Sequence, residues 1–220
     1  MNFPRFLLAL LVLLALATPQ AYAAAKARPA KLSDTDKAEI VRAEAYLNEI
    51  RTLKARFLQA APDGQFSEGT LFLSRPGKLR LEYDPPVPIL IIGAYDLLTY
   101  HDKELKQTSH LPIESTPAGI LVRSRIGLMG GDLTVTGFRN SEGLDRISLA
   151  RTDDPQAGEI TLVFTQEPYQ LRQWTVRDPQ GLITTVTLSD ARTGLKLEPK
   201  LFEFDDPSFV RPGVGRVNLQ

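Results

Sequence analysis

Cysteine is absent from the 220 residues of the chain, and histidine occurs only twice. Without cysteine the chain forms no disulfide bond, so packing and hydrogen bonding alone must hold the fold together. The two histidines, His101 and His110, lie in strand-like or loop sequence without the spacing of metal ligands. We therefore expect neither a metal site nor a cofactor, and we interpret both histidines as surface or edge residues.

The chain also lacks an excess of charge of either sign, since 26 Lys and Arg residues balance 26 Asp and Glu residues. Nucleic acid requires a clustered basic surface, so we expect no nucleic-acid partner. The sequence contains no Gly-x-Ser-x-Gly elbow, no His-Glu-x-x-His pair and no phosphate-binding glycine loop. It therefore predicts a protein that is not an enzyme, unless scattered residues assemble a site.

Long apolar runs are confined to the N-terminus. Arg5 precedes the apolar run Phe6–Ala17, and Ala21-Tyr22-Ala23 provides a small-x-small cleavage signal. The run is too short for a bilayer, which takes about 20 apolar residues. This pattern predicts a secretory signal peptide at residues 1–23, followed by a single soluble, periplasmic domain at residues 24–220.

The first element expected in the mature chain is a helix. Ser33 precedes Asp34 and Asp36, which is typical of an N-cap with acidic residues in the first turn. Apolar residues then recur at helical spacing, which predicts an amphipathic helix that ends near Thr52. These residues are Ile40, Ala43, Leu47 and Ile50.

Short strands dominate the remainder. They are separated by turn signals at intervals of about 8–12 residues, which implies an antiparallel barrel or sandwich. The predicted strands cover residues 53–59, 89–92, 97–101, 106–109, 133–138, 144–150, 159–164, 171–177, 182–189 and 200–204. Thr116-Pro117-Ala118 predicts a short helix that carries Ile120 and Leu121 and extends toward Gly130.

The most informative stretch is Gly69–Pro86, which predicts two strands joined at Arg75-Pro76-Gly77-Lys78. Proline presets φ and glycine tolerates positive φ, so Pro-Gly favours a turn. A four-residue turn pairs Phe72 with Leu81 and places Phe72, Leu79, Leu81 and Tyr83 on one apolar face. We interpret this face as the lining of a cavity, or as core that packs against the first helix.

Several segments occur in a characteristic order. The Arg-Pro-Gly hairpin with its Glu-Tyr-x-Pro-Pro exit is the most specific of them. The others are Leu53–Gln59, Leu90–Ile92, Thr99–Asp102, Ser115–Leu121, Trp174–Asp178 and Phe202–Pro207. In this order they resemble the periplasmic outer-membrane lipoprotein carrier family, the LolA-like proteins, over essentially all of the mature chain.

The resemblance implies a mainly β fold with helices, namely a curved antiparallel half-open β-barrel covered by lid helices. It implies a monomeric chaperone that takes acylated lipoproteins from an inner-membrane releasing transporter and passes them to an outer-membrane acceptor lipoprotein. It also implies that Arg75 holds the lid closed through lid backbone carbonyls. The expected lipid-binding residues are Phe72, Leu79, Leu81, Tyr83, Leu90, Ile120 and Leu121.

Other functions remain open for this fold. One is a carrier of a different lipid or glycolipid, and another is a sensor that binds misplaced lipoprotein, although related sensors carry a second domain. A membrane-anchored acceptor would need a lipid-modified cysteine, which the sequence lacks. Acyl chains recovered with or without an attached peptide would separate the first alternative from the lipoprotein carrier.

Overall fold

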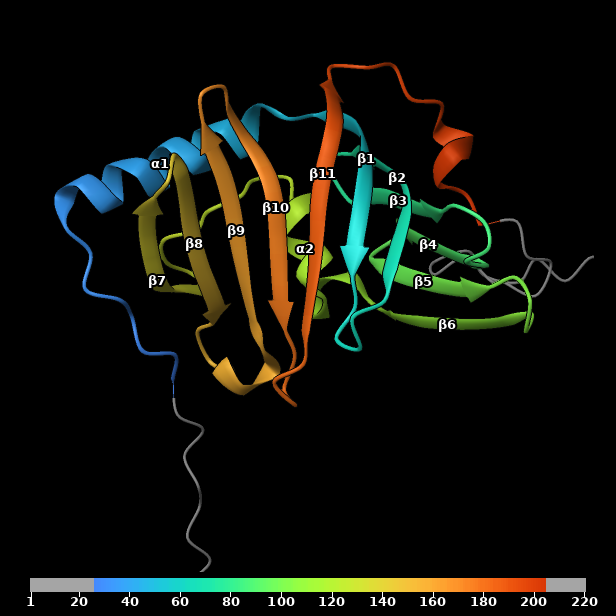
Figure 1. The fold of residues 1–220 in the computed structure, drawn as a ribbon, viewed down its shortest axis with the longest axis horizontal. Coiled ribbons are helices and arrows are strands. Elements are labelled where there is room, and N and C mark those ends of the chain that lie inside the picture. Colours follow the sequence, from blue (N-terminus) through green and yellow to red (C-terminus); the bar gives the residue numbers. More distant parts are fainter. Residues whose placement is uncertain (1–25, 205–220) are drawn as a thin grey trace, which may run out of the picture.

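The computed structural model describes residues 26–204, so the predicted signal peptide lies outside the described residues. Within this range eleven strands form one antiparallel sheet in the order β6-β5-β4-β3-β2-β1-β11-β10-β9-β8-β7 (Figure 1). The strands are β1 (Thr52–Ala60), β2 (Phe66–Ser74), β3 (Lys78–Tyr83), β4 (Ile89–Ala94), β5 (Leu97–Asp102), β6 (Gln107–Pro112), β7 (Leu133–Ser141), β8 (Leu144–Arg151), β9 (Glu159–Gln166), β10 (Tyr169–Arg177) and β11 (Ile183–Thr193).

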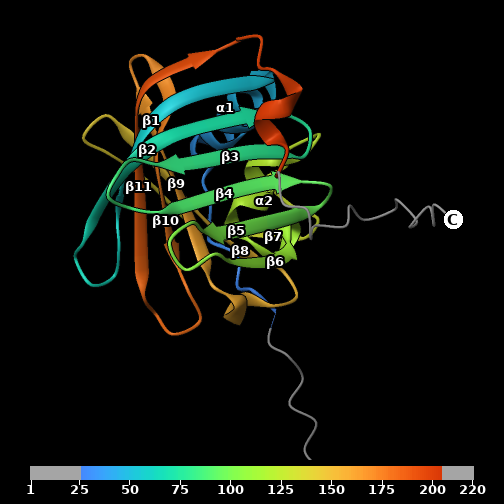
Figure 2. The same ribbon diagram turned by 90° about the vertical axis from the view of Figure 1, so that its right-hand side faces the viewer.

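The sheet is strongly curved. β1 pairs with both β2 and β11 and so joins the two halves. In Figure 1 the strands β7 to β11 run nearly upright, whereas β4 to β6 run across the view. Figure 2, turned by 90°, shows β2 to β6 as the near wall with α1 and α2 behind them. β6 and β7 lie at the two edges and do not pair with each other, so the predicted half-open antiparallel barrel is confirmed.

Helix α1 (Asp34–Glu49) crosses the inner side of the sheet near one end (Figure 1). Its start is fixed by a capping box, in which the Ser33 hydroxyl accepts from the Asp36 N–H and the Asp36 carboxylate accepts from the Ser33 N–H. The predicted N-cap is therefore confirmed. The apolar side chains Ile40, Ala43 and Leu47 face the sheet and are buried.

The chain between β6 and β7 forms the second part of the cover. The short helix η1 (Ile113–Ser115) leads into α2 (Pro117–Val122), whose first residue is a proline, as predicted. The predicted extension of α2 toward Gly130 is wrong, because Arg123 adopts ψ 146° and ends the helix. We call residues 113–129 the lid segment, and α1 and the lid segment together the lid.

The core lies between the concave face of the sheet and the lid. Ile126 and Leu128 of the lid segment are 2% and 0% exposed, so the loop after α2 packs as firmly as a helix would. Other fully buried side chains come from α1 and from strands in both halves of the sheet. They include Ile40, Phe57, Leu79, Ile147, Leu162, Phe164 and Leu188. The lid thus occupies the apolar face that the sequence predicted would need a cover.

The register of the β2–β3 hairpin differs from the prediction by one residue. The turn comprises only Arg75, Pro76 and Gly77, and Ser74 pairs with Lys78. Gly77 has φ +77°, the left-handed conformation that closes a three-residue hairpin loop. Because side chains alternate along a strand, this one-residue slip exchanges the predicted faces of β2.

The predicted strand at residues 200–204 is wrong. Pro199–Phe202 forms the short helix η3, which packs against β3 and β4. Pro199 occupies the start of this helix, a position that its fixed φ favours. Arg80 Nη1 donates to the main-chain oxygen of Leu201 at 3.2 Å, and Phe202 is buried. These contacts place η3 on the convex side, where it covers part of the sheet.

Candidate functional site

Arg75 connects the hairpin to both parts of the lid. Its Nε donates to the main-chain oxygen of Arg123 at 2.7 Å, and its Nη2 donates to that of Ser124 at 3.3 Å. Its Nη1 donates to the main-chain oxygens of Leu47 and, at 3.2 Å, of Ile50. One guanidinium therefore bonds the end of α1 and the loop after α2 at the same time.

The end of a helix explains this arrangement. The last carbonyls of α1 have no partner within the helix, and its last turn contains no basic residue. The planar guanidinium of Arg75 supplies several donors in a fixed fork, which a lysine would not. A further link between the hairpin and the lid is the Gly77 N–H, which donates to the Val122 oxygen at 2.8 Å.

The Arg75 side chain is a buried cation. The residue is 8% exposed, and it forms no ion pair with a carboxylate among the described residues. Burial, followed by the charge of Arg51, lowers the pKa of the Arg75 guanidinium from its ordinary value. Carbonyl oxygens offset the lost hydration only in part. The cation is therefore held by neutral backbone oxygens and not by a carboxylate.

Two polar residues of α1 fix the lid segment directly. Asn48 Nδ2 donates to the Ile126 oxygen at 2.8 Å, and Asn48 Oδ1 accepts from the Ile126 N–H at 2.9 Å. One oxygen of Glu44 accepts from the N–H groups of Leu128 and Met129 at 2.6 and 3.0 Å. These bonds satisfy backbone groups of a loop that has no regular structure, so α1 and the lid segment form one connected unit.

A small apolar cavity lies beneath this junction. It has about 320 Å³ of empty space, its mouth included, and we call it the lid cavity. Arg75 is the single charged residue in its lining. The remaining lining is Leu47, Ile50, Leu53, Leu71, Leu73, Leu121, Ile126, Leu171, Trp174 and Leu188. Such a lining suits hydrocarbon, and it offers no pair of groups for acid–base or nucleophilic chemistry.

The profile of the family described as "Outer membrane lipoprotein carrier protein LolA" matches residues 48–205, which is most of the chain. The chain belongs to the LolA family. The matched region contains every strand, the lid segment and Arg75, whereas most of α1 precedes it.

Two lipoprotein carrier proteins agree with this assignment in sequence. An outer-membrane lipoprotein carrier protein of Dechloromonas aromatica is 31% identical over 177 residues, which cover 74% of this chain and 81% of that protein. One of Methylococcus capsulatus is 29% identical over 178 residues, covering 77% and 84%. A solved LolA superfamily structure from Nitrosomonas europaea aligns at 12% identity with a TM-score of 0.44, covering 76% of this chain and 98% of that one.

Most of the residues predicted for the LolA-like site lie on the concave side. Leu79, Leu81 and Tyr83 of β3 belong to the buried core beneath the lid. Leu121 of α2 lines the lid cavity. Ile120, its neighbour in sequence, is also buried but lines a different hollow. Whether any of these side chains binds lipid stays a prediction.

Phe72 and Leu90 lie on the opposite side of the sheet from the one predicted. Phe72 pairs with Arg80, and Leu90 pairs with Glu82. These positions alternate with those of the concave residues, so both side chains face the convex side. Phe72 lies there beneath the ammonium group of Lys54, 5.4 Å from its ring centroid. Phe72 and Leu90 therefore do not line the concave face, and their prediction as lipid-binding residues of that face is wrong.

Sequence reasoning missed several residues of the site. Leu71 and Leu73 were not among the predicted lipid-binding residues, but they line the lid cavity because of the register slip. Trp174 was not among them either, and it belongs to both the core and the cavity wall. Asn48 and Glu44 gave no signal, because polar residues on an amphipathic helix are usually solvated.

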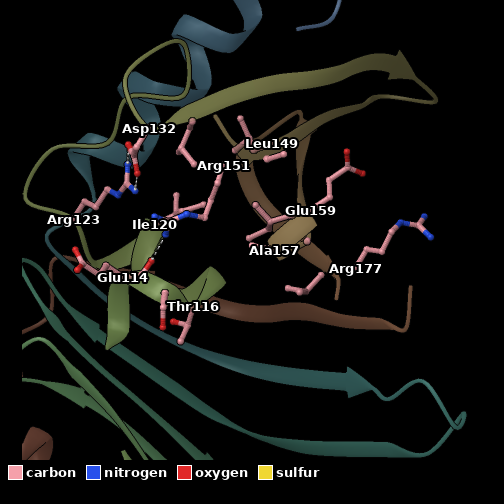
Figure 3. A pocket seen from close by; sticks show the side chains of 16 residues that line it. Glu114, Thr116, Ile120, Arg123, Asp132, Leu149, Arg151, Ala157, Glu159 and Arg177 are labelled. Atoms are coloured by element: carbon pink, nitrogen blue, oxygen red, sulfur yellow. Dashed lines mark hydrogen bonds and ion pairs between the residues drawn. The ribbon is translucent and has the colours of Figure 1, made fainter. Parts of the chain in front are cut away.

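A second hollow lies near the edge of the sheet, between the lid segment and strands β7 to β10 (Figure 3). It has about 530 Å³ of empty space, its mouth included, and we call it the seam hollow. Its apolar lining includes Ile120, Leu133, Leu149, Ile160 and Val176, and its charged lining is Glu114, Arg123, Asp132, Arg151, Glu159 and Arg177.

An ion pair closes one side of the seam hollow. Arg123 Nη1 donates to Asp132 Oδ1 at 2.9 Å, and this hydrogen bond is the main cause that lowers the pKa of Asp132.

Within residues 26–204 no helix combines the length and apolarity needed to cross a membrane. In the same range no three acidic or histidine side chains converge in a way that could hold a metal.

Proposed function

We propose that the protein binds the acyl chains of lipoproteins on the concave face of its sheet and carries them from the inner to the outer membrane. The observation that carries the proposal is Arg75, which bonds both parts of the lid over an apolar cavity. Membership of the LolA family, together with relatives named outer-membrane lipoprotein carrier protein, supports lipoprotein as the cargo class.

The size of the lid cavity bears on how cargo binds. Only about 20 Å³ of it is free for a water-sized molecule, so it holds no acyl chain while the lid is closed. Cargo must therefore displace the lid. Concave residues such as Leu79 and Leu81 would then exchange their contacts with lid side chains for contacts with acyl chains.

The exchange also makes release feasible. Burial of one CH₂ contributes about 0.8 kcal/mol, so one 16-carbon chain contributes roughly 12 kcal/mol as an upper bound. Binding that strong would make release very slow. A lid that competes for the same apolar face lowers the net affinity, because the free energy of lid closure is subtracted from that of binding.

The proposal also covers the location of the carrier, its partners and its oligomeric state. A signal peptide at residues 1–23 would direct the chain to the periplasm, where residues 24–220 act as one domain. The carrier would receive cargo from an inner-membrane releasing transporter and deliver it to an outer-membrane acceptor lipoprotein. We propose that it acts as a monomer and as a binding protein without catalysis.

Mass spectrometry of the protein purified from the periplasm tests this function. We expect peptides with an acylated N-terminus to co-purify, and to be enriched in the Arg75→Leu variant because its lid stays open. The matched control is Lys78→Leu, which removes an exposed cation from the first residue of β3, directly after the same turn. Recovery of phospholipid or glycolipid without any attached peptide would contradict the proposal and favour a carrier of free lipid.

A further inference from the structure

The seam hollow lies beside the site described above but is not part of it. It is bounded by the lid segment on one side and by β7 to β10 on the other, close to the edge where the sheet does not close (Figure 3). Leu149 and Ile160 form its floor and are 1% and 4% exposed. The lid cavity shares none of its lining residues with the seam hollow and includes Arg75 in its wall.

Neighbouring residues of α2 line the two hollows. Ile120 lines the seam hollow, and the next residue, Leu121, lines the lid cavity. On β10, Val176 lines the seam hollow and Trp174 lines the lid cavity. Residues two apart on a strand share a face and lie about 6.6 Å apart. The two apolar surfaces are therefore continuous along β10.

The rim of the seam hollow holds one guanidinium group that forms no ion pair with a carboxylate in the described chain. Arg151 donates only to the main-chain oxygen of Glu114, at 3.3 Å (Figure 3). Arg177 is no such group, because it alternates with Val176 on β10 and its exposed side chain points away from the hollow (Figure 3). By contrast, Arg123 is paired with Asp132, and the Glu159 carboxylate accepts the Thr136 hydroxyl at 2.7 Å.

We propose that the seam hollow is a second acyl-binding site, where an acyl chain lies against Ile120, Leu149 and Val176 and its carbonyl-bearing end meets Arg151. The proposal rests on the carrier function proposed above and gives it an entry route. An acyl chain that is seated in this hollow touches α2 directly, so pushing α2 aside would join the two hollows.

The ligand class follows from the two ends of the hollow. The floor is apolar and fits hydrocarbon, while guanidinium donors at the rim match the oxygens of an ester, an amide or a carboxylate. A lipoprotein presents acyl chains that end in ester and amide carbonyls, and a free fatty acid presents a carboxylate. Both probes share this chemistry and are compared in the test.

Tryptophan quenching by a brominated acyl chain distinguishes the two hollows. The chain contains one tryptophan, Trp174, which reports on the lid cavity. The double variant Trp174→Phe/Ala157→Trp moves the fluorophore to the rim of the seam hollow, where Ala157 is exposed. The probes are a free fatty acid and a triacylated lipopeptide, each brominated in the middle of a chain.

We expect both probes to quench the tryptophan introduced at position 157, at concentrations at least tenfold below those that quench Trp174. Arg151→Glu should raise the required concentration about tenfold, because a charge-assisted hydrogen bond is lost and a repulsive charge is added. Arg139→Glu is the matched control, since Arg139 is an exposed arginine of β7 outside the hollow, and it should change nothing.

Three results would overturn the proposal. If Trp174 is quenched and the introduced tryptophan is not, the seam hollow binds no acyl chain, although the carrier function stands. If neither tryptophan responds to the lipopeptide, the carrier function fails as well. If only the free fatty acid binds at the seam, or if Arg151→Glu and Arg139→Glu behave alike, the hollow does not recognise cargo in the proposed way.

Discussion

Replacement of Arg75 by leucine isolates the contact that holds the lid closed. The variant keeps a side chain that fills space but removes every donor to the lid. Two of the lost bonds reach Arg123 and Ser124 in the lid segment, and the others reach the end of α1. Because Arg75 lies in a turn and not in a strand, the sheet itself should remain folded.

The expected magnitude follows from the number and type of these bonds. A hydrogen bond from a charged donor contributes about 1.5 to 3 kcal/mol net, and an opened lid lets the guanidinium recover hydration. The two bonds to the lid segment therefore stabilise the closed state by about 3 kcal/mol, or about 100-fold in the equilibrium between closed and open lids. Where the closed state predominates, Arg75→Leu should tighten cargo binding by up to about the same factor.

Titration with a fluorescent triacylated lipopeptide measures this change, and transfer to acceptor vesicles measures release. We expect affinity to increase and release to slow in Arg75→Leu. Arg75→Lys should behave similarly, because one ammonium group cannot replace the planar fork. Lys78→Leu should match the natural protein. If Arg75→Leu remains folded and binds and releases the lipopeptide as the natural protein does, Arg75 does not control the lid.

Two further predictions concern the lid and the core. At Gly119 of α2 an added Cβ would lie 2.5 Å from the Ile113 oxygen, so Gly119→Ala should lower the free energy of unfolding by about 1–3 kcal/mol, whereas Gly127→Ala, with nothing within 4 Å, should cost far less. Equal melting temperatures for the two variants would refute this. Burial raises the pKa of Tyr83 to about 12 from 10.0, so its contribution to stability is complete below pH 10 and is lost as the pH rises toward 12. Denaturation across this range should show a loss of about 2 kcal/mol that Tyr83→Phe lacks, and identical pH profiles would contradict the assignment.

The sequence predicted the elements better than their pairing. The capping box at Ser33 and most strands were predictable because their signals are local. The hairpin register was not, since Pro76-Gly77 is compatible with turns of three or four residues. The error of one residue moved Phe72 to the wrong face and hid Leu73. Strand alternation amplifies any error in a turn in this way.

The candidate site shows the same limit. Arg75 was identified through the resemblance of its hairpin, but its partners are backbone oxygens, which carry no sequence signature. Asn48 is neutral to unfavourable within a helix, and its role depends on a loop 78 residues away. Long-range contacts of this kind become visible only in three dimensions.

The central claim is that the lid moves away from the hairpin when cargo binds. The chain has no cysteine, so spin labels can be placed at Lys78→Cys in β3 and at Arg125→Cys in the lid segment, both of which are exposed positions. The distance between these labels, measured in the empty protein and in the protein loaded with acylated lipoprotein, should increase on loading. An unchanged distance in a fully loaded sample would contradict the account.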